Sequence, residues 1–224
     1  MHALPTRPVK HQNRCSIKWN AARRADTMAS FMKRIVLTGG PCSGKTVISS
    51  AIVAGEPHRY VRVPEAATQV YEALRTRWDR LDGAGRRDVQ RRIYHLQIEQ
   101  EERLSAEYPN HVLLLDRGTV DGAAYWPQGP DDYWRDLGTS LKAQIARYDN
   151  VILLQSAAAI GLYEGDTSNP CRFEDAAAAV RNDGLLTQLW QSHPAITPIN
   201  AYQSLADKIR AVKNALDALA RQRQ

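Results

Sequence analysis

Residues 33–46 read KRIVLTGGPCSGKT, and this stretch decides the fold. Residues 33–38 form a short, largely apolar and β-branched run, which is typical of a buried strand in a parallel sheet. A glycine-rich turn follows, and residues 47–54, VISSAIVA, predict a helix. The order of strand, glycine-rich turn and helix predicts the first unit of an α/β domain.

The turn matches the pattern G-x-x-x-x-G-K-[ST] at every fixed position. Glycines let the backbone curl so that several N–H groups point at phosphate oxygens, and the next helix adds its positive N-terminal end. We therefore expect this turn to bind the phosphates of a nucleoside triphosphate. The residues expected to surround the nucleotide are Gly39, Gly40, Pro41, Cys42, Ser43, Gly44, Lys45, Thr46 and Val47.

Two side chains at the end of the turn carry the expected chemistry. Lys45 can reach the β- and γ-phosphates, which makes it a catalytic candidate. The Thr46 hydroxyl can bind Mg²⁺, a cation that prefers oxygen ligands and keeps several waters. The pattern therefore predicts ATP with Mg²⁺ as the bound group. GTP stays open, although the sequence has no N-K-x-D string of the kind that binds guanine.

Further strand and helix patterns alternate along the rest of the chain. They predict an α/β fold of the P-loop NTPase class, with a parallel five-stranded sheet between helices, over residues 32–224. The expected strands are residues 33–38, 60–63, 111–116, 150–155 and 195–200.

Three helices have details that a structure can test. A long polar helix is expected at about 86–107, after a break at 81–85, with a stripe formed by Ile93, Leu96, Gln100 and Leu104. The helix expected near 174–193 has a weak point at Asp183-Gly184. The last helix is expected to bury one face, which carries Leu205, Ile209, Val212, Leu216 and Leu219.

The third expected strand ends on an acid, Asp116, followed by Arg117. A carboxylate at the C-terminal tip of a parallel strand lies in the crevice where ligands bind, so Asp116 is expected to hold the Mg²⁺ hydration shell. Arg117 either binds a phosphoryl group or the acceptor, or pairs with Asp121 and shapes the loop. Asp121 is a further candidate for the metal shell or for acceptor binding.

Charge is unevenly distributed along the chain. Residues 1–34 carry a net charge of +7, and because the whole chain carries +6, residues 35–224 sum to −1. A basic footprint over the whole domain is absent, which argues against nucleic acid as a partner. The three cysteines show no paired spacing and no stretch approaches 18 apolar residues, so we expect a cytoplasmic protein without a transmembrane segment.

Residues 1–31 are expected to be a disordered basic leader. Their composition resembles a transit peptide and resembles an upstream-extended start equally well. Met28 and Met32 lie just before the first strand and favour the second interpretation.

Three stretches together resemble a known group: GGPCSGKT, VPEAA (residues 63–67) and LLLDRGTVDGAAYW (residues 113–126). They resemble the kinase-like P-loop NTPase family that includes the nicotinamide riboside kinase domain of NadR and an animal trafficking protein that binds GTP and phosphoinositides. Proteins of this group carry an AAA-type ATP-binding domain. The resemblance covers about residues 33–215 and implies a five-stranded parallel core with a mobile lid.

The VPEAA string is similar to the V-P-E string of deoxynucleoside kinases. In that family the Glu after the second strand acts as base toward the acceptor hydroxyl, so the resemblance implies that role for Glu65. A carboxylate near a phosphate loop can accept a hydroxyl proton, although Glu65 could instead cap the next helix.

The resemblance also implies a lid at about residues 156–174. Arg172 in this segment either stabilises the transferring phosphate, as a catalytic residue, or pairs with Glu174 on the surface. Tyr125 could wall the acceptor pocket. Asn200, at the end of the last strand, is expected where related folds hold the nucleobase.

One arginine-rich run lies inside the expected fold. The default interpretation is a solvated hairpin that faces Asp79, Asp82 and Asp88, and the alternative is binding of an anionic lipid headgroup or a phosphorylated acceptor. The predicted function is a small-molecule kinase for a nucleoside-like acceptor, and the alternative is a nucleotide-dependent switch, ATPase or GTPase that binds a partner or phosphoinositide. The run comprises Arg75, Arg77, Arg80, Arg86, Arg87, Arg91 and Arg92.

Overall fold

A computed structural model describes residues 34–162 and 176–222 of the chain. The chain divides after Phe31, and Met32–Gln224 form one compact unit. The expected leader, residues 1–31, lies outside the described residues.

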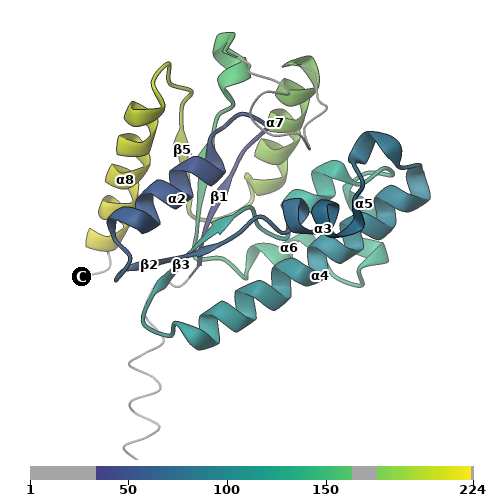
Figure 1. Ribbon diagram of the computed structural model, residues 1–224, viewed down its shortest axis with the longest axis horizontal. Coiled ribbons are helices and arrows are strands. Elements are labelled where there is room, and N and C mark those ends of the chain that lie inside the picture. Colours follow the sequence, from purple (N-terminus) through teal and green to yellow (C-terminus); the bar gives the residue numbers. More distant parts are fainter. Residues whose placement is uncertain (1–33, 163–175, 223–224) are drawn as a thin grey trace, which may run out of the picture. The chain divides into compact units, whose positions relative to one another are not determined.

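All five expected strands are present in the described residues, and every pairing between them is parallel. The sheet order is β2-β3-β1-β4-β5, so the strand before the phosphate turn is central (Figure 1). The predicted α/β class with a five-stranded parallel sheet is confirmed. The strands are β1 (Arg34–Thr38), β2 (Tyr60–Val63), β3 (Val112–Asp116), β4 (Asn150–Leu154) and β5 (Ile196–Ile199).

Helices connect the strands and cover both faces of the sheet. The α-helices are α2 (Lys45–Gly55), α3 (Ala66–Leu74), α4 (Gly83–Glu107), α5 (Pro130–Asp136), α6 (Leu141–Ile145), α7 (Ala176–Trp190) and α8 (Leu205–Arg221). The described residues also form three short 3₁₀ helices, which are η1 (Trp78–Arg80), η2 (Asp121–Tyr125) and η3 (Ala157–Ile160).

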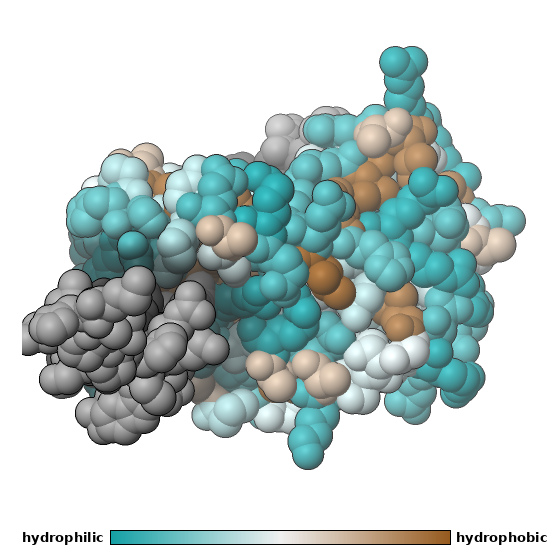
Figure 2. Space-filling view, turned by 90° about the horizontal axis from the view of Figure 1, so that it is seen from below, coloured by the Kyte–Doolittle hydropathy of each residue, from teal (hydrophilic) through white to brown (hydrophobic). Residues whose placement is uncertain are grey.

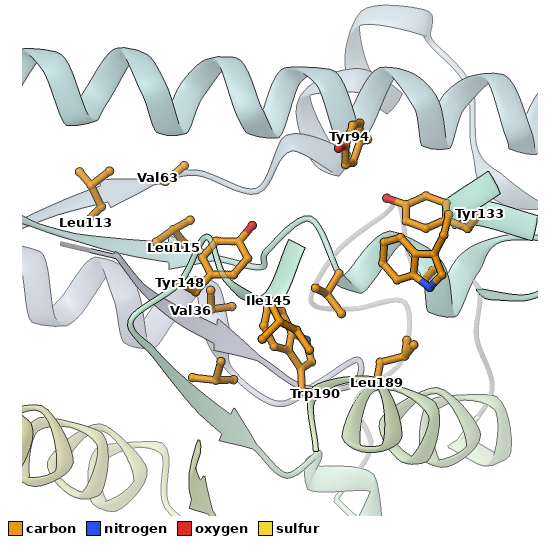
Figure 3. Close-up of a cluster of buried hydrophobic side chains, with 14 of the residues drawn as sticks. Val36, Val63, Tyr94, Leu113, Leu115, Tyr133, Ile145, Tyr148, Leu189 and Trp190 are labelled. Carbon is orange, nitrogen blue, oxygen red and sulfur yellow. The ribbon is translucent and has the colours of Figure 1, made fainter. Parts of the chain in front are cut away.

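The core consists of one layer of side chains on each face of the sheet. Alternate residues of β1, β3 and β4 point to opposite faces, as the period of two in a strand requires. On one face they pack against α2 and α8, through Ile48 and Val212 among others. On the other face they pack against α4, α5, α6 and α7, where Tyr94, Tyr133 and Trp190 supply large aromatic rings (Figure 3).

The long helix α4 differs from its expected form in two ways. It begins at Gly83, because the Asp82 carboxylate caps the helix by accepting a hydrogen bond from the Gly85 amide at 2.8 Å. The predicted break at 81–85 was therefore wrong for residues 83–85, which are helical. Of the predicted stripe, Gln100 and Leu104 are buried as expected, whereas Ile93 and Leu96 are only half-buried. The buried positions include three glutamines and one glutamate, and they are Val89, Gln90, Tyr94, Gln97, Gln100, Glu101 and Leu104.

The last two long helices also show the limits of pattern reading. Helix α7 runs unbroken through Asp183-Gly184, so the expected weak point does not interrupt it. In α8, Val212 and Leu216 are buried as expected, but Leu205 is 45% exposed. Lys208 is buried instead, because its ammonium group reaches a backbone carbonyl at the end of β4.

Figure 2 shows one face of the protein, on which hydrophilic residues predominate and hydrophobic residues form separate groups. Among the described residues, no helix combines the length and the hydropathy that crossing a membrane requires.

Candidate functional site

The glycine-rich turn, which we call the phosphate loop (residues 39–46), joins the end of β1 to the start of α2. Gly39 has φ of +139°, and a Cβ atom at this position would lie 2.0 Å from the carbonyl oxygen of Leu154. Gly44 has φ of +86° and is the N-cap residue of α2. Both positions therefore need glycine, for close backbone approach and for a left-handed conformation respectively.

The side chain of Lys45 lies across the phosphate loop. It is only 3% exposed, and its Nζ atom donates to the carbonyl oxygens of Gly39 and Gly40 and to the Ser43 hydroxyl at 2.8–2.9 Å. These bonds hold the ammonium group against the concave side of the turn. Thr46 and Val47, on the first turn of α2, are exposed. A ligand can therefore reach the Thr46 hydroxyl from solvent.

Asp116 lies on β3 beside the end of β1, since Leu37 and Asp116 are partners in the parallel register. Its carboxylate is fully buried, and its Oδ2 atom accepts a hydrogen bond from Arg62 Nη2 at 2.9 Å. The Oδ1 atom has no hydrogen-bond partner in the described part of the chain. An unpartnered buried carboxylate oxygen fits the predicted place of a Mg²⁺ hydration shell.

Glu65 follows β2 and is the N-cap residue of α3, but its side chain makes no capping hydrogen bond to the helix. Its Oε1 atom accepts from Arg117 Nε at 2.5 Å, and its Oε2 atom accepts from Thr68 Oγ1 at 2.9 Å. Burial opposes ionisation of Glu65, but the charges of Arg117 and Lys45 outweigh it, so the pKa is lowered to about 2. The carboxylate is therefore ionised near neutral pH and lies close to the phosphate loop.

Arg117 binds two of the candidate acids, Glu65 and Asp121, through its guanidinium group. Its side chain is 15% exposed, and besides Glu65 it contacts Asp121 at 3.3 Å. Burial works against the charged form, but the surrounding negative groups, Glu65 and Asp121 among them, raise its pKa. Its backbone has φ of +79°, which non-glycine residues rarely adopt. The structure thus shows the predicted pairing with Asp121 and, in addition, a shorter one with Glu65.

The carboxylate of Asp121 is bound from several sides. Its Oδ1 atom accepts from Thr38 Oγ1 at 2.6 Å, and its Oδ2 atom accepts from the Gly118 amide at 3.1 Å and from Trp190 Nε1 at 3.2 Å. Asp121 is 2% exposed. These contacts connect β1, α7 and the loop after β3, so the geometry favours a positioning role over direct contact with an acceptor.

Buried polar side chains of α4 form a hydrogen-bond network with the loop after β3. Gln97 donates to the carbonyl oxygen of Arg117 at 3.3 Å and to Glu101 at 3.0 Å. Glu101 is fully buried and also binds Tyr148 and Arg147. Sequence reasoning missed this network, because polar residues on a helix normally indicate a solvent-facing side.

The remaining candidates lie at the edges of the site. Tyr125 follows Asp121 on η2, and its ring centroid lies 5.5 Å from the Arg117 guanidinium and 6.4 Å from the Trp78 ring. Asn200, just after β5, is exposed. Arg172 and the expected lid from residue 163 onward lie outside the described residues, whereas residues 157–160 form η3.

The arginine-rich run is paired both with acids that the sequence indicated, as in the Arg77–Asp79 pair, and with acids that it did not indicate. Arg87 and Arg91 both bind Asp136 on α5 at 2.6 Å, and the pKa of Asp136 is lowered to about 2, mainly by its hydrogen bond with Arg91. Arg92 pairs with Asp88 as expected. Asp82 caps α4 instead of facing the arginines. Much of the charge of the run is therefore neutralised within the fold.

A parallel sheet with β1 central, a phosphate loop between β1 and α2 and an acid on the neighbouring β3 define a kinase-like P-loop NTPase. The family model described as AAA domain matches residues 34–202, and the chain belongs to this family. Members of such P-loop families generally bind nucleotides.

Among solved structures, the fold is similar to that of a deoxyadenosine kinase from M. mycoides, determined with dCMP and a flexible dCDP bound as products. The two share 15% sequence identity with a TM-score of 0.56, over 83% of this chain and 99% of the other. The likeness concerns the fold. No curated protein matches this sequence.

Proposed function

We propose that the protein is a small-molecule kinase that transfers the γ-phosphoryl group of ATP to a hydroxyl of a nucleoside-like acceptor. The observation that carries the proposal is the Glu65–Arg117 pair, which lies close enough to Lys45 for its charge to lower the Glu65 pKa. An anionic base, a guanidinium cation and a phosphate-binding lysine in one place are the groups that phosphoryl transfer to a hydroxyl requires.

On the donor side, the amides of the phosphate loop and the N-terminal end of α2 would bind the phosphates. The Lys45 ammonium would exchange its bonds to the Gly39 and Gly40 carbonyls for bonds to the β- and γ-phosphates. Thr46 and Asp116 would hold Mg²⁺, in part through water, and the ion would supply countercharge to the phosphates. Asn200 would lie near the nucleobase.

On the acceptor side, Glu65 would hold the acceptor hydroxyl and take its proton. As the hydroxyl oxygen forms its bond to the γ-phosphorus, the bond from phosphorus to the leaving ADP oxygen breaks and the proton passes to Glu65. A carboxylate with a pKa of about 2 is a weak base while Arg117 holds it. Movement of the Arg117 guanidinium toward the transferring phosphoryl group would raise that pKa at the moment when the proton arrives.

The outer residues would complete the acceptor side. Tyr125, with Trp78 against its ring, would form a wall of the acceptor pocket. Asp121 would act through Arg117, which it binds at Nη1, whereas Glu65 binds at Nε. The predicted catalytic role of Arg172 remains part of the proposal as the sequence indicates it.

The second candidate function is a nucleotide-dependent switch whose arginine-rich run binds a partner or an anionic lipid headgroup. The pairing of Arg87 and Arg91 with Asp136 weakens this candidate, because paired guanidinium groups attract anions less. Arg75 and Arg80 are exposed and would form the contact if it exists. Charge reversal at both positions, followed by flotation with phosphoinositide vesicles, tests this candidate separately.

The test of the kinase proposal combines a ligand screen with one variant. Nucleosides and vitamins are screened by thermal shift with a Mg-ATP analogue, and hits are assayed for acceptor-dependent ADP release. We expect turnover with one acceptor class, and about a 10²–10⁴-fold lower kcat for Glu65→Gln with the ATP KM unchanged. Slow hydrolysis that no acceptor stimulates, or a Glu65→Gln variant with full activity, would contradict the proposal.

A further inference from the structure

Asp183 of α7 binds two backbone amides on two different loops. Its Oδ1 atom accepts from the Gly40 amide of the phosphate loop at 2.6 Å. Its Oδ2 atom accepts from the Ser156 amide, just after β4, at 3.3 Å. One half-buried carboxylate thus connects α7 to the turn after β1 and to the turn after β4.

The same two turns are also bound directly to each other. The Ser156 hydroxyl donates to the carbonyl oxygen of Pro41 at 2.5 Å, and the Ala157 amide donates to the carbonyl oxygen of Cys42 at 3.3 Å. Asp183 accepts from the amide of Gly40, which directly precedes Pro41. Residues 40–42 of the phosphate loop are therefore held by hydrogen bonds to α7 and to the turn after β4.

A buried cation lies near this arrangement. Lys208 of α8 is 4% exposed, and its Nζ atom donates to the carbonyl oxygen of Gln155 at 2.6 Å. Burial lowers the pKa of Lys208 to about 8, and the charge of Asp183 acts in the opposite direction. The Asp183 carboxylate thus interacts with a buried cation as well as with two backbone N–H groups, and hydrogen bonds from N–H groups to a carboxylate are charge-assisted.

We propose that Asp183 is a positioning residue of the nucleotide site, which fixes the phosphate loop in its binding conformation through the Gly40 amide before a nucleotide arrives. A loop ordered in advance loses less conformational entropy on binding, so affinity rises without a contact between Asp183 and the ligand. The inference rests on the proposed nucleotide binding and deepens it. It assigns a function to Asp183 of α7, a residue that belongs neither to the phosphate-loop pattern nor to the proposed acceptor-side residues.

The experiment compares Asp183→Ala and Asp183→Asn with Gln188→Ala, a matched control at an exposed position on the same helix. Affinity for a non-hydrolysable Mg-ATP analogue is measured by calorimetry at a temperature where circular dichroism shows every variant folded. Hydrogen exchange of the Gly40 and Ser156 amides is followed in the absence of nucleotide. The exchange rates of these two amides measure local opening of the loop, separately from the global stability of the protein.

We expect Asp183→Ala to weaken binding about tenfold, as for the loss of a charge-assisted hydrogen bond, and to speed exchange at both amides. Asp183→Asn should weaken binding less, because its amide oxygen can still accept from one N–H group while its NH₂ group faces the other. The control should leave affinity and exchange unchanged.

Unchanged affinity in Asp183→Ala, with or without faster exchange, would overturn the inference while leaving the proposed function in place. If Asp183→Ala does not fold, unchanged affinity in Asp183→Asn overturns it equally. Absence of binding by the wild-type protein would overturn the proposed function and the inference together.

Discussion

Arg62 on β2 donates a hydrogen bond to the Oδ2 atom of Asp116 on β3 at 2.9 Å, and its Nε atom donates to the Ser49 hydroxyl on α2 at 3.1 Å. The Arg62 side chain is 28% exposed, whereas that of Asp116 is fully buried. Arg62 therefore supplies positive charge that compensates the burial of the Asp116 carboxylate.

The first prediction concerns this pair. Arg62→Gln should lower the free energy of unfolding by about 2 kcal/mol, because it removes a hydrogen bond to a buried charge. The double variant Arg62→Gln with Asp116→Asn should cost less than the sum of the two single variants, since the uncompensated charge is then absent. Urea unfolding of the four proteins measures this, and strictly additive effects would show that the pair is not coupled.

The second prediction concerns acid stability. The pKa of Glu65 is about 2 in the folded protein, against roughly 4.3 for an unperturbed Glu. A lowered pKa contributes stability that is present above the unfolded value and is lost as the pH falls toward the folded value. Glu65→Gln should therefore flatten the loss of stability between about pH 5 and pH 2. Unfolding midpoints at several pH values test this, with an unchanged slope as the contrary result.

The third prediction compares a glycine at which a Cβ atom would clash, Gly122, with one at which it would not, Gly184. A Cβ atom at Gly122 would lie 2.4 Å from the Tyr133 hydroxyl, which donates to the Thr119 carbonyl, so Gly122→Ala should destabilise the protein by about 1–3 kcal/mol. A Cβ atom at Gly184, inside α7, has no described atom within 4 Å. Gly184→Ala should therefore stabilise by about 0.5–1 kcal/mol. Thermal unfolding of both variants measures the difference in sign.

The fourth prediction concerns Arg117. Arg117→Lys keeps the positive charge but cannot bind Glu65 and Asp121 together through a planar guanidinium group. We expect kcat to fall by about 10²–10³ while the ATP KM changes little, because the interaction lost is made in the transition state. Steady-state kinetics with the acceptor found in the screen measure both constants. A parallel rise in KM without a change in kcat would assign Arg117 to ground-state binding.

Most of the fold was predictable from the sequence, because its signals are local. The phosphate loop has fixed spacing, and the five strands are short apolar runs separated by helical patterns. The boundaries of α4 were not predictable in the same way, since Asp82 acts as its cap only when residues 83–85 turn into the helix. Its buried face was predicted only in part, because Gln97 and Glu101 are buried through tertiary partners that the sequence does not show.

The candidate site was predictable only in part, for the same reason. Lys45, Glu65, Asp116 and Arg117 all lie within or next to recognisable strings, and the structure brings them together around the ends of β1, β2 and β3. Asp183 belongs to no such string, and Arg62, although it lies on a predicted strand beside one, had no predicted role. Their importance comes from the distances across the sheet and between α7 and the phosphate loop, which no local pattern encodes.

The backbone amide of Arg117 donates to the carbonyl oxygen of Leu37, and Thr38 donates to Asp121, so the end of β1 is bonded to the segment after β3. The phosphate loop and the Arg117 backbone are therefore held by two neighbouring, hydrogen-bonded strands, which fixes the distance between them. In the proposed kinase, this distance would be set when the sheet forms, and movements during turnover would be left to side chains.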